Sequence, residues 1–316
     1  MAYESITTID AQYMGPGRAA VYLIEQEGRA AFVDNNTARA LPLFLEALSA
    51  RGLSPEQVEY LIVTHVHLDH AGGTGALLER CPNATVLAHP KAAPHLIAPE
   101  RLVASTMGVY GGDLFRDLYG EVAPVPEGRV RIMGDDETLD WRGRTLRFLH
   151  TRGHANHHFS IYDGGTNSVF TGDSFGIGRS EAVRPGPAFV FCTTSPTDFD
   201  ADAARLSAQR IVATGAQRCW LGHFDYVDDP DALLPMLLAS VDAHAGFMQA
   251  ADAEGIADGD LVPWLREHIA AYADEHLRAA GVADFEADRH WLEGDILLNA
   301  MGLAWRVQRA RKKTGS

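Results

Sequence analysis

Four side chains that can bind metal ions lie within six residues, in the segment His65-Val66-His67-Leu68-Asp69-His70. Imidazole nitrogens and carboxylate oxygens are the donors that zinc and related divalent ions prefer. In an extended backbone His65, His67 and Asp69 project to one side, and His70 turns away as a helix begins. Four ligands on so short a segment fit poorly around one tetrahedral ion, so the spacing favours two ions.

Three further candidate ligands follow predicted strands, and each comes directly after a glycine. His154 follows the strand LRFLH, Asp173 follows SVF and His223 follows RCWL. A histidine that only packs in a core would lie within a strand, whereas these residues lie just beyond the strand ends. Glycine allows the backbone to approach a ligand closely. The pattern therefore predicts that these residues serve the same metal centre.

The predicted secondary structure forms two β-rich halves, each flanked by helices. A buried strand at 60–64 leads directly into the histidine cluster, and a helix follows it to about Arg80. The other predicted elements are strands at 19–26, 30–34 and 84–89, helices at 38–51 and 98–120, a β-rich stretch from 129 to 175, helices at 199–214 and 231–250, a strand at 218–221, and helices from 251 onward. Such a pattern predicts two sheets packed face to face with helices outside.

The composition excludes several classes of protein. The chain has 316 residues, with 27 Lys+Arg against 42 Asp+Glu and a formal net charge of −15. An acidic chain lacks the basic face that nucleic acids and anionic membranes require, so we expect neither as a partner. The sequence contains no apolar run long enough to span a membrane, and its first residues lack the basic and apolar regions of a signal peptide, so we expect none. Its three cysteines are widely separated, which favours a reducing, cytoplasmic location.

The motif series HxHxDH, GH, GD and GH resembles the metallo-β-lactamase superfamily of metallo-hydrolases over roughly residues 5–250. The resemblance implies an α/β fold, a four-layer αβ/βα sandwich, with a catalytic domain at 1–250 and a helical C-terminal extension at 251–316. It also implies two divalent ions, for which we expect Zn²⁺, with Fe or Mn as alternatives. The implied ligands are His65, His67 and His154 for one ion, Asp69, His70 and His223 for the other, and Asp173 for both.

Two divalent ions about 3.5–4 Å apart can share a water and lower its pKa to roughly 7. We expect Asp69 to be the catalytic residue that accepts the proton of this water. His158 matches the second histidine of the family's GHxxxH pattern and is expected to orient its neighbours without binding metal. Tyr110, Phe175 and Tyr226 are candidates to line the substrate pocket, with the Tyr226 hydroxyl near the oxyanion.

These residues predict a hydrolase that attacks the carbonyl of a small-molecule ester, thioester or lactone. The alternative is a mononuclear non-haem iron sulfur oxygenase, similar to persulfide dioxygenases, which would use part of the ligand set. A third hypothesis is that the protein is a non-catalytic metal-binding scaffold. The amphipathic C-terminal helices are expected to cover the cleft or to form a homodimer contact.

A serine hydrolase is a further hypothesis, because Gly172-Asp173-Ser174-Phe175-Gly176 matches the GxSxG nucleophile elbow. That elbow requires a sharp turn from a strand into a helix at the serine. The following segment, 177–187, contains two prolines and two glycines. We therefore expect no helix there and no nucleophilic serine.

Overall fold

In the computed structural model, the described residues are 3–179, 186–194 and 198–314. They form two compact units. Unit 1 contains most of the chain up to His150, together with His157–Gly172 and Trp220–Asp225; unit 2 contains Thr151–Asn156, Asp173–Cys219 and the chain from Tyr226 onward. The predicted division into 1–250 and 251–316 stays a prediction, and residue 250 lies inside helix α8 (Pro230–Ala253).

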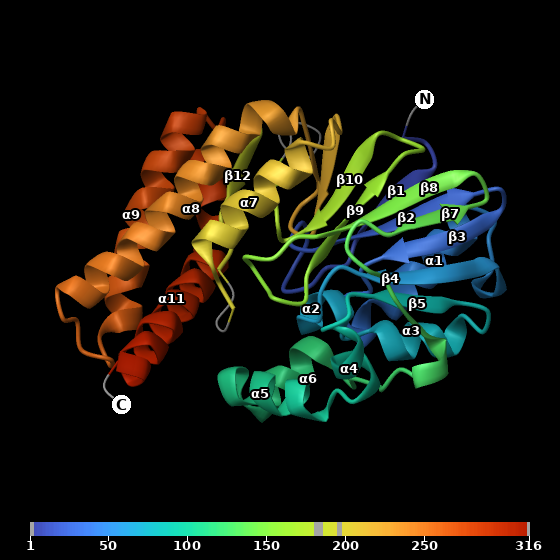
Figure 1. The fold of residues 1–316 in the computed structure, drawn as a ribbon, viewed down its shortest axis with the longest axis horizontal. Coiled ribbons are helices and arrows are strands. Elements are labelled where there is room, and N and C mark those ends of the chain that lie inside the picture. Colours follow the sequence, from blue (N-terminus) through green and yellow to red (C-terminus); the bar gives the residue numbers. More distant parts are fainter. Residues whose placement is uncertain (1–2, 180–185, 195–197, 315–316) are drawn as a thin grey trace. The chain divides into compact units, whose positions relative to one another are not determined.

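The first sheet of unit 1 has six strands in the order β1-β2-β3-β4-β5-β6 (Figure 1). Strands β1 to β3 are antiparallel, and β3 to β6 are parallel. The strands predicted at 19–26 and 30–34 are confirmed as β2 and β3, and they form a hairpin at Glu27-Gly28. Both turn residues have the positive φ angles, 48° and 70°, that a tight two-residue hairpin requires. The strands are β1 (Ile6–Asp10), β2 (Ala20–Gln26), β3 (Arg29–Val33), β4 (Val58–Val63), β5 (Thr85–Ala88) and β6 (Val130–Ile132).

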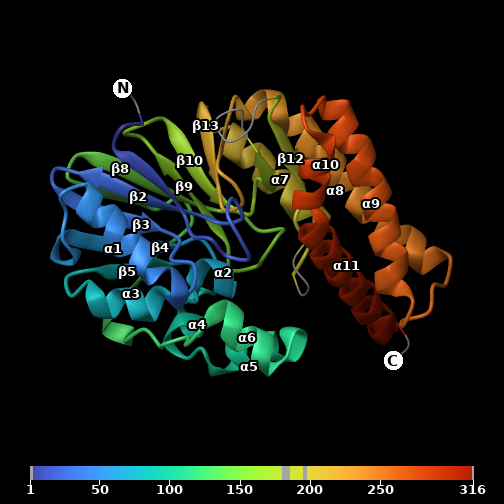
Figure 2. The same cartoon turned by 180° about the vertical axis from the view of Figure 1, so that it is seen from behind.

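Helices cover one face of this sheet, where the apolar side of each helix is buried against the strands. Figure 2 shows α1 (Leu41–Ala50) and α3 (Thr74–Arg80) over the same face. Phe44 and Leu48 of α1 and Leu77 of α3 pack with Phe32 and Leu61 of the sheet in one buried core. The remaining helices of unit 1 are α2 (Leu68–Ala71), α4 (Ala93–Ile97), α5 (Glu100–Tyr110) and α6 (Gly112–Tyr119).

The second sheet of unit 1 is built from consecutive antiparallel strands. They are β7 (Thr138–Trp141), β8 (Arg144–His150), β9 (Phe159–Asp163) and β10 (Ser168–Gly172), and Trp220 and Leu221 of β13 (Arg218–Leu221) follow β10 in the order. The predicted β-rich stretch from 129 to 175 was wrong in one respect, because its first strand, at 130–132, does not belong to this sheet. This strand is β6, and it pairs in parallel with β5. Its partner β5 lies before it in the chain, and helices α4 to α6 separate the two strands. Composition alone does not specify which strand a given strand pairs with.

Unit 2 consists mainly of helices. The long helices predicted near residues 199–214, 231–250 and beyond 251 are confirmed: α7 (Ala201–Val212), α8 (Pro230–Ala253), α9 (Leu261–Ala280), α10 (Phe285–Trp291) and α11 (Glu293–Thr314). The unit also contains β11 (Ile177–Arg179), β12 (Phe189–Phe191) and β14 (Tyr226–Asp228). The segment 177–187 was expected to form no helix: its residues 177–179 form strand β11, and residues 180–185 lie outside the described part. Among the described helices, none combines the length and the apolar character needed to cross a bilayer.

Candidate metal centre

The edge of the first sheet brings two polar segments together. Strands β3 and β4 are parallel, with Val33 paired to Ile62. Parallel strands present their carboxyl ends at the same edge, where ligand-binding loops of α/β proteins lie. The segment that begins at Asp34 therefore leaves the sheet beside the segment that begins at Thr64. The predicted histidine cluster follows Thr64 directly.

The carboxylate of Asp34 contacts both ends of the segment that contains this cluster, Thr64 and His70. Its Oδ1 accepts hydrogen bonds from the backbone N–H of Thr64 at 2.9 Å and from the Thr64 hydroxyl at 2.9 Å. Its Oδ2 lies 2.8 Å from Nδ1 of His70. All three residues are buried. The carboxylate thus holds the His70 ring in one orientation, as the outer partner of a metal-binding histidine commonly does.

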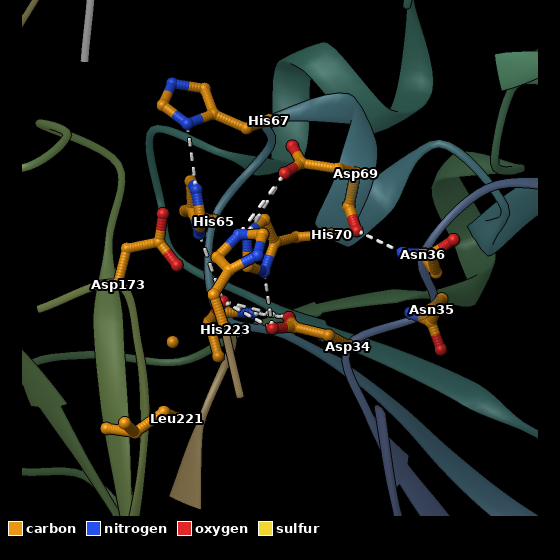
Figure 3. Close-up of polar contacts among 12 residues, drawn as sticks. Asp34, Asn35, Asn36, His65, His67, Asp69, His70, Asp173, Leu221 and His223 are labelled. Carbon is orange, nitrogen blue, oxygen red and sulfur yellow. Dashed lines mark hydrogen bonds and ion pairs between the residues drawn. The ribbon is translucent and has the colours of Figure 1, made fainter. Parts of the chain in front are cut away.

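His223 comes to the same place from the end of β13. Its Nδ1 lies 2.7 Å from the backbone carbonyl oxygen of Arg18, which can only accept a hydrogen bond. Its Nε2 lies 3.2 Å from Nε2 of His70. The Oδ2 atom of Asp69 is 3.7 Å from Nε2 of His70 and 3.4 Å from Nε2 of His223. Figure 3 shows His70, His223 and Asp69 pointing toward one another above Asp34.

These three side chains fit a cation and fit poorly without one. A neutral imidazole carries its proton on one nitrogen only. With Nδ1 of His70 donating to Asp34 and Nδ1 of His223 donating to the Arg18 carbonyl, both Nε2 atoms present lone pairs. The Asp69 carboxylate adds a third acceptor. Three acceptors that face one another repel unless a positive ion lies among them.

The spacing agrees with the size of such an ion. Zinc binds nitrogen or oxygen at about 2.0–2.2 Å in a tetrahedral arrangement, which separates the donor atoms by about 3.3–3.6 Å. The three separations between Asp69, His70 and His223 are 3.2, 3.4 and 3.7 Å. This group is one that could hold a metal ion.

The Asp69 carboxyl is held in its ionised form. In the metal-free protein, burial acts to raise the pKa of Asp69, but protonated His70, His223 and His67, whose positive charge takes the place of a bound cation, outweigh burial together with the hydrogen bond that a protonated His223 donates. The net effect places the pKa of Asp69 well below its usual range. A carboxylate that stays ionised at neutral pH is available as a metal ligand.

The other residues of the HxHxDH motif also lie in unit 1. The fully buried His65 ring has its Nδ1 atom 3.1 Å from the Thr64 hydroxyl and its Nε2 atom 2.9 Å from Nδ1 of His67. The His158 ring lies nearly parallel to the His65 ring, with centroids 4.8 Å apart. A Cβ atom at Gly172 would lie 2.6 Å from Nε2 of His158, so only glycine fits beside this ring.

Two predicted ligands, His154 and Asp173, belong to unit 2. Both are buried, and Nε2 of His154 lies 3.3 Å from Oδ2 of Asp173. Ser174, next to Asp173, donates its hydroxyl to the Thr151 carbonyl at 2.9 Å. The structure thus brings together these two residues in unit 2 and the other five predicted ligands in unit 1.

The predicted pocket residues have different surroundings. Phe175 is fully buried. Tyr226 packs under the guanidinium of Arg218, whose carbon lies 3.5 Å from the centre of the tyrosine ring. Tyr110 ends α5, and its side chain lies outside the described part of the structure. Their contact with substrate stays a prediction.

The sequence analysis missed Asp34 and the carbonyl of Arg18. Asp34 lies 36 residues before His70, so no local spacing connects them. A signal was nevertheless present, because Asp34 directly follows the apolar strand AAFV, as Thr64 follows YLIV. An acidic residue at the carboxyl end of a neighbouring parallel strand is a candidate for the same site. The Arg18 carbonyl is a backbone group and has no sequence signal.

Comparison with known proteins identifies the class. Residues 14–217 match the Metallo-beta-lactamase superfamily, and the chain therefore belongs to this superfamily. It is 28% identical over 163 residues to the hydroxyacylglutathione hydrolase of Aeromonas hydrophila, a match that covers 50% of this chain and 48% of that protein. It is 31% identical over 194 residues to the hydroxyacylglutathione hydrolase of Xylella fastidiosa, a match that covers 60% of this chain and 54% of that protein. These matches span about half the length of the curated relatives.

Solved structures agree on the fold. An archaeal metallo-beta-lactamase superfamily protein from Sulfolobus tokodaii matches with a TM-score of 0.61 at 21% identity, over 97% of this chain and 98% of that chain. A metallo-beta-lactamase family protein from Thermus thermophilus matches with a TM-score of 0.61 at 20% identity, over 98% of this chain and 94% of that chain. The predicted fold class, the α/β metallo-β-lactamase fold with additional C-terminal helices, is confirmed.

Proposed function

We propose that this protein is a metal-dependent hydrolase of small-molecule thioesters, with esters and lactones as further substrate classes. The observation that carries the proposal is the group formed by Asp69, His70 and His223, in which three electron-pair donors face one another at 3.2–3.7 Å. The similarity to two hydroxyacylglutathione hydrolases, whose names specify a glutathione thioester, supports the thioester class.

The proposed ligand set is the one that the motif series implies. Asp69, His70 and His223 would hold one divalent ion, His65, His67 and His154 would hold a second, and Asp173 would be a ligand of both. We propose Zn²⁺, because a set of imidazoles and carboxylates suits it. When bound, such ions lower the pKa of water and polarise a carbonyl oxygen.

The chain's own residues supply orientation and proton transfer. Asp34 and the Arg18 carbonyl hold the rings of His70 and His223 through their Nδ1 atoms. Asp69 Oδ2 lies within 3.7 Å of both rings and is the proposed acceptor of the proton that leaves the attacking water. Fixed rings keep the donor atoms in place through the reaction, so the site needs little reorganisation.

The test is hydrolysis of a thioester by the full-length protein, followed through the released thiol, after chelation and after return of each metal. We expect activity to vanish on chelation and to return with Zn²⁺. The exposed His290 provides a control variant, His290→Ala, that should keep full activity. Absence of hydrolysis of thioesters, esters and lactones by the zinc-loaded protein would contradict the proposal.

The same preparation tests the sulfur oxygenase alternative. An oxygenase would bind iron and consume O₂ in the presence of a persulfide. Oxygen uptake by the iron-loaded protein, without thioester hydrolysis by the zinc-loaded protein, would replace the hydrolase proposal. Metal binding without either activity would favour the scaffold reading.

A further inference from the structure

The turn that carries His223 is short, and its two ends are joined. His223 lies between Leu221, the last residue of β13, and Asp225. The backbone N–H of Leu221 donates to the carbonyl of Asp225 at 2.9 Å. We refer to residues 221–225 as the His223 turn. The position of the histidine ring depends on the groups that hold this turn in place.

The β1–β2 hairpin contacts the His223 turn at several points. The backbone N–H of Ala20, in β2, donates to the carbonyl of Gly222 at 2.9 Å. The hydroxyl of Thr8, in β1, donates to the carboxylate of Asp225 at 2.8 Å. The segment that leads into β2 also supplies the Arg18 carbonyl, the partner of the histidine ring. The hairpin therefore holds the middle and the end of the turn.

Tyr22 of β2 contacts the same turn with its side chain. Its hydroxyl donates to the carbonyl of Leu221 at 2.6 Å, and the carbonyl of Asp225 also accepts from it. A phenol has one proton, so the two carbonyl oxygens share it. A single side-chain atom thus holds the first and the last residue of the His223 turn.

The ring of Tyr22 is fixed between the two sheets of unit 1. Its neighbours along β2, Val21 and Leu23, pack in the core beneath the helices, so Tyr22 faces the second sheet. The tyrosine is only 3% exposed, and its ring centroid lies 5.4 Å from that of Phe170 and 5.3 Å from that of Trp220. A phenylalanine would supply this packing without the cost of burying a hydroxyl, so the packing does not account for the hydroxyl.

We propose that Tyr22 is a positioning residue of the metal centre, whose hydroxyl fixes the His223 turn so that Nε2 of His223 faces His70 and Asp69. This inference rests on the proposed function, because it treats His223 as a metal ligand. Tyr22 acts through the backbone of the turn and takes no direct part in binding the ion.

The variant Tyr22→Phe removes the hydroxyl and keeps the ring. Stepwise zinc titration of the metal-free, full-length protein against a fluorescent chelator measures the affinity for each ion. We expect the affinity for one ion to fall about tenfold, the lower end of the range for groups that orient a ligand, because Tyr22 acts through the backbone. The affinity for the other ion should not change.

Hydrogen exchange in the metal-free protein gives a second measurement that needs no bound ion. In Tyr22→Phe the amide of Leu221 should exchange about three- to tenfold faster, because the turn loses a hydrogen bond and opens more often. The amide of Phe148, which donates to the Glu137 carbonyl at 2.8 Å in a distant part of the same unit, should keep its wild-type rate.

The variant Tyr162→Phe is the matched control. Tyr162 lies on β9 of the same unit, and its hydroxyl donates to Oδ1 of Asn167 at 3.0 Å. A second control, Thr166→Val, removes a buried hydroxyl that donates to Asp163 at 2.6 Å. Both controls should retain the wild-type zinc affinities and the wild-type exchange rate of the Leu221 amide.

Unchanged zinc affinities in Tyr22→Phe, an equal loss for both ions, or the same loss in Tyr162→Phe would overturn the positioning role. Thioester hydrolysis is measured on the same samples, so that the two proposals fail differently. Weaker binding of one ion in Tyr22→Phe, without hydrolysis by the wild type, would retain the positioning role and reject the hydrolase. Hydrolysis by the wild type, with unchanged zinc affinities in Tyr22→Phe, would retain the hydrolase and reject the positioning role.

Discussion

Each unit contains a pair of histidines largely shielded from solvent, of which only His223 is partly exposed, and the two pairs use their ring nitrogens differently. In unit 2, Nδ1 of His244 donates to the Ser240 carbonyl at 2.7 Å, and its Nε2 accepts from the Asn299 amide at 3.1 Å. In the same unit, Nε2 of His276 donates to a backbone carbonyl at 2.8 Å, and its Nδ1 accepts from a tyrosine hydroxyl at 3.2 Å. Each neutral ring thus has one acceptor and one donor as partners.

In unit 1, His70 and His223 are satisfied at Nδ1, but their Nε2 atoms face each other and the Asp69 carboxylate. His70 is as buried as His244 and His276, so burial does not distinguish a metal ligand from a structural histidine. The chemical nature of the group that faces the second ring nitrogen distinguishes them. A buried ring with a donor opposite its lone pair stabilises the fold, and a ring with other lone pairs opposite it requires a cation.

The largest expected effect is on catalysis. His223→Ala should lower kcat/KM for the thioester by about 10³-fold or more, because it removes a ligand from a centre worth several kcal/mol. His244→Ala should destabilise the protein and leave kcat/KM of the folded fraction within about twofold. Steady-state kinetics at matched folded concentration measure both. Equal losses in the two variants would remove the distinction between the histidine pairs.

A smaller effect is expected at the carboxylate that orients His70. Asp34→Asn keeps the shape of the side chain but weakens the hold on Nδ1, and should reduce zinc affinity about 10–100-fold. Asp163→Asn is the matched control, because Asp163 is a fully buried carboxylate of the same unit that pairs with Arg144. It should reduce stability without changing zinc affinity. Competition with a fluorescent chelator measures the affinities, and unchanged zinc binding in Asp34→Asn would contradict the assigned role.

The smallest expected effect is a pH dependence of stability from unit 2. Desolvation by burial lowers the pKa of His244 to about 4, with a further decrease from His276 and an opposing increase from the Ser240 carbonyl. A histidine in the unfolded chain has a pKa of about 6.5, so the unfolded state binds more protons between about pH 4 and pH 6.5. The contribution of His244 is therefore fully present above pH 6.5, and stability decreases as the pH falls below it.

Urea unfolding of the chelated protein at pH 7 and pH 5 measures this dependence. His244 alone should lower the free energy of unfolding by about 2 kcal/mol between these values. His244→Leu should show a correspondingly smaller decrease than the wild type. His290→Leu, at an exposed position, should retain the wild-type decrease. If His244→Leu and the wild type lose the same free energy, the neutral, paired state of His244 is wrong.

The sequence predicted the parts of the site whose residues are close together or follow a strand. HxHxDH is contiguous, and His154, Asp173 and His223 each follow a glycine at a strand end. Asp34 was missed because its role depends on β3 pairing in parallel with β4. The strand β6 was grouped with the wrong half for the same reason, since pairing is a long-range property.

The hydrogen-bond partners of His244 and His276 could not be predicted from the sequence either. It depends on contacts between α8, β12, α9 and α11, whose residues are separated by up to 86 positions along the chain. Helical periodicity locates the buried face of each helix but does not reveal which polar group lies opposite a buried ring.

The central claim is that Asp69, His70 and His223 bind a metal ion, and the metal content of the zinc-saturated, desalted protein tests it most directly. We predict two ions per wild-type chain and per His290→Ala chain, and the loss of one ion in His223→Ala. Elemental analysis with quantified protein gives these ratios. The same metal content in His223→Ala as in the wild type, or no retained metal in the wild type, would contradict the claim.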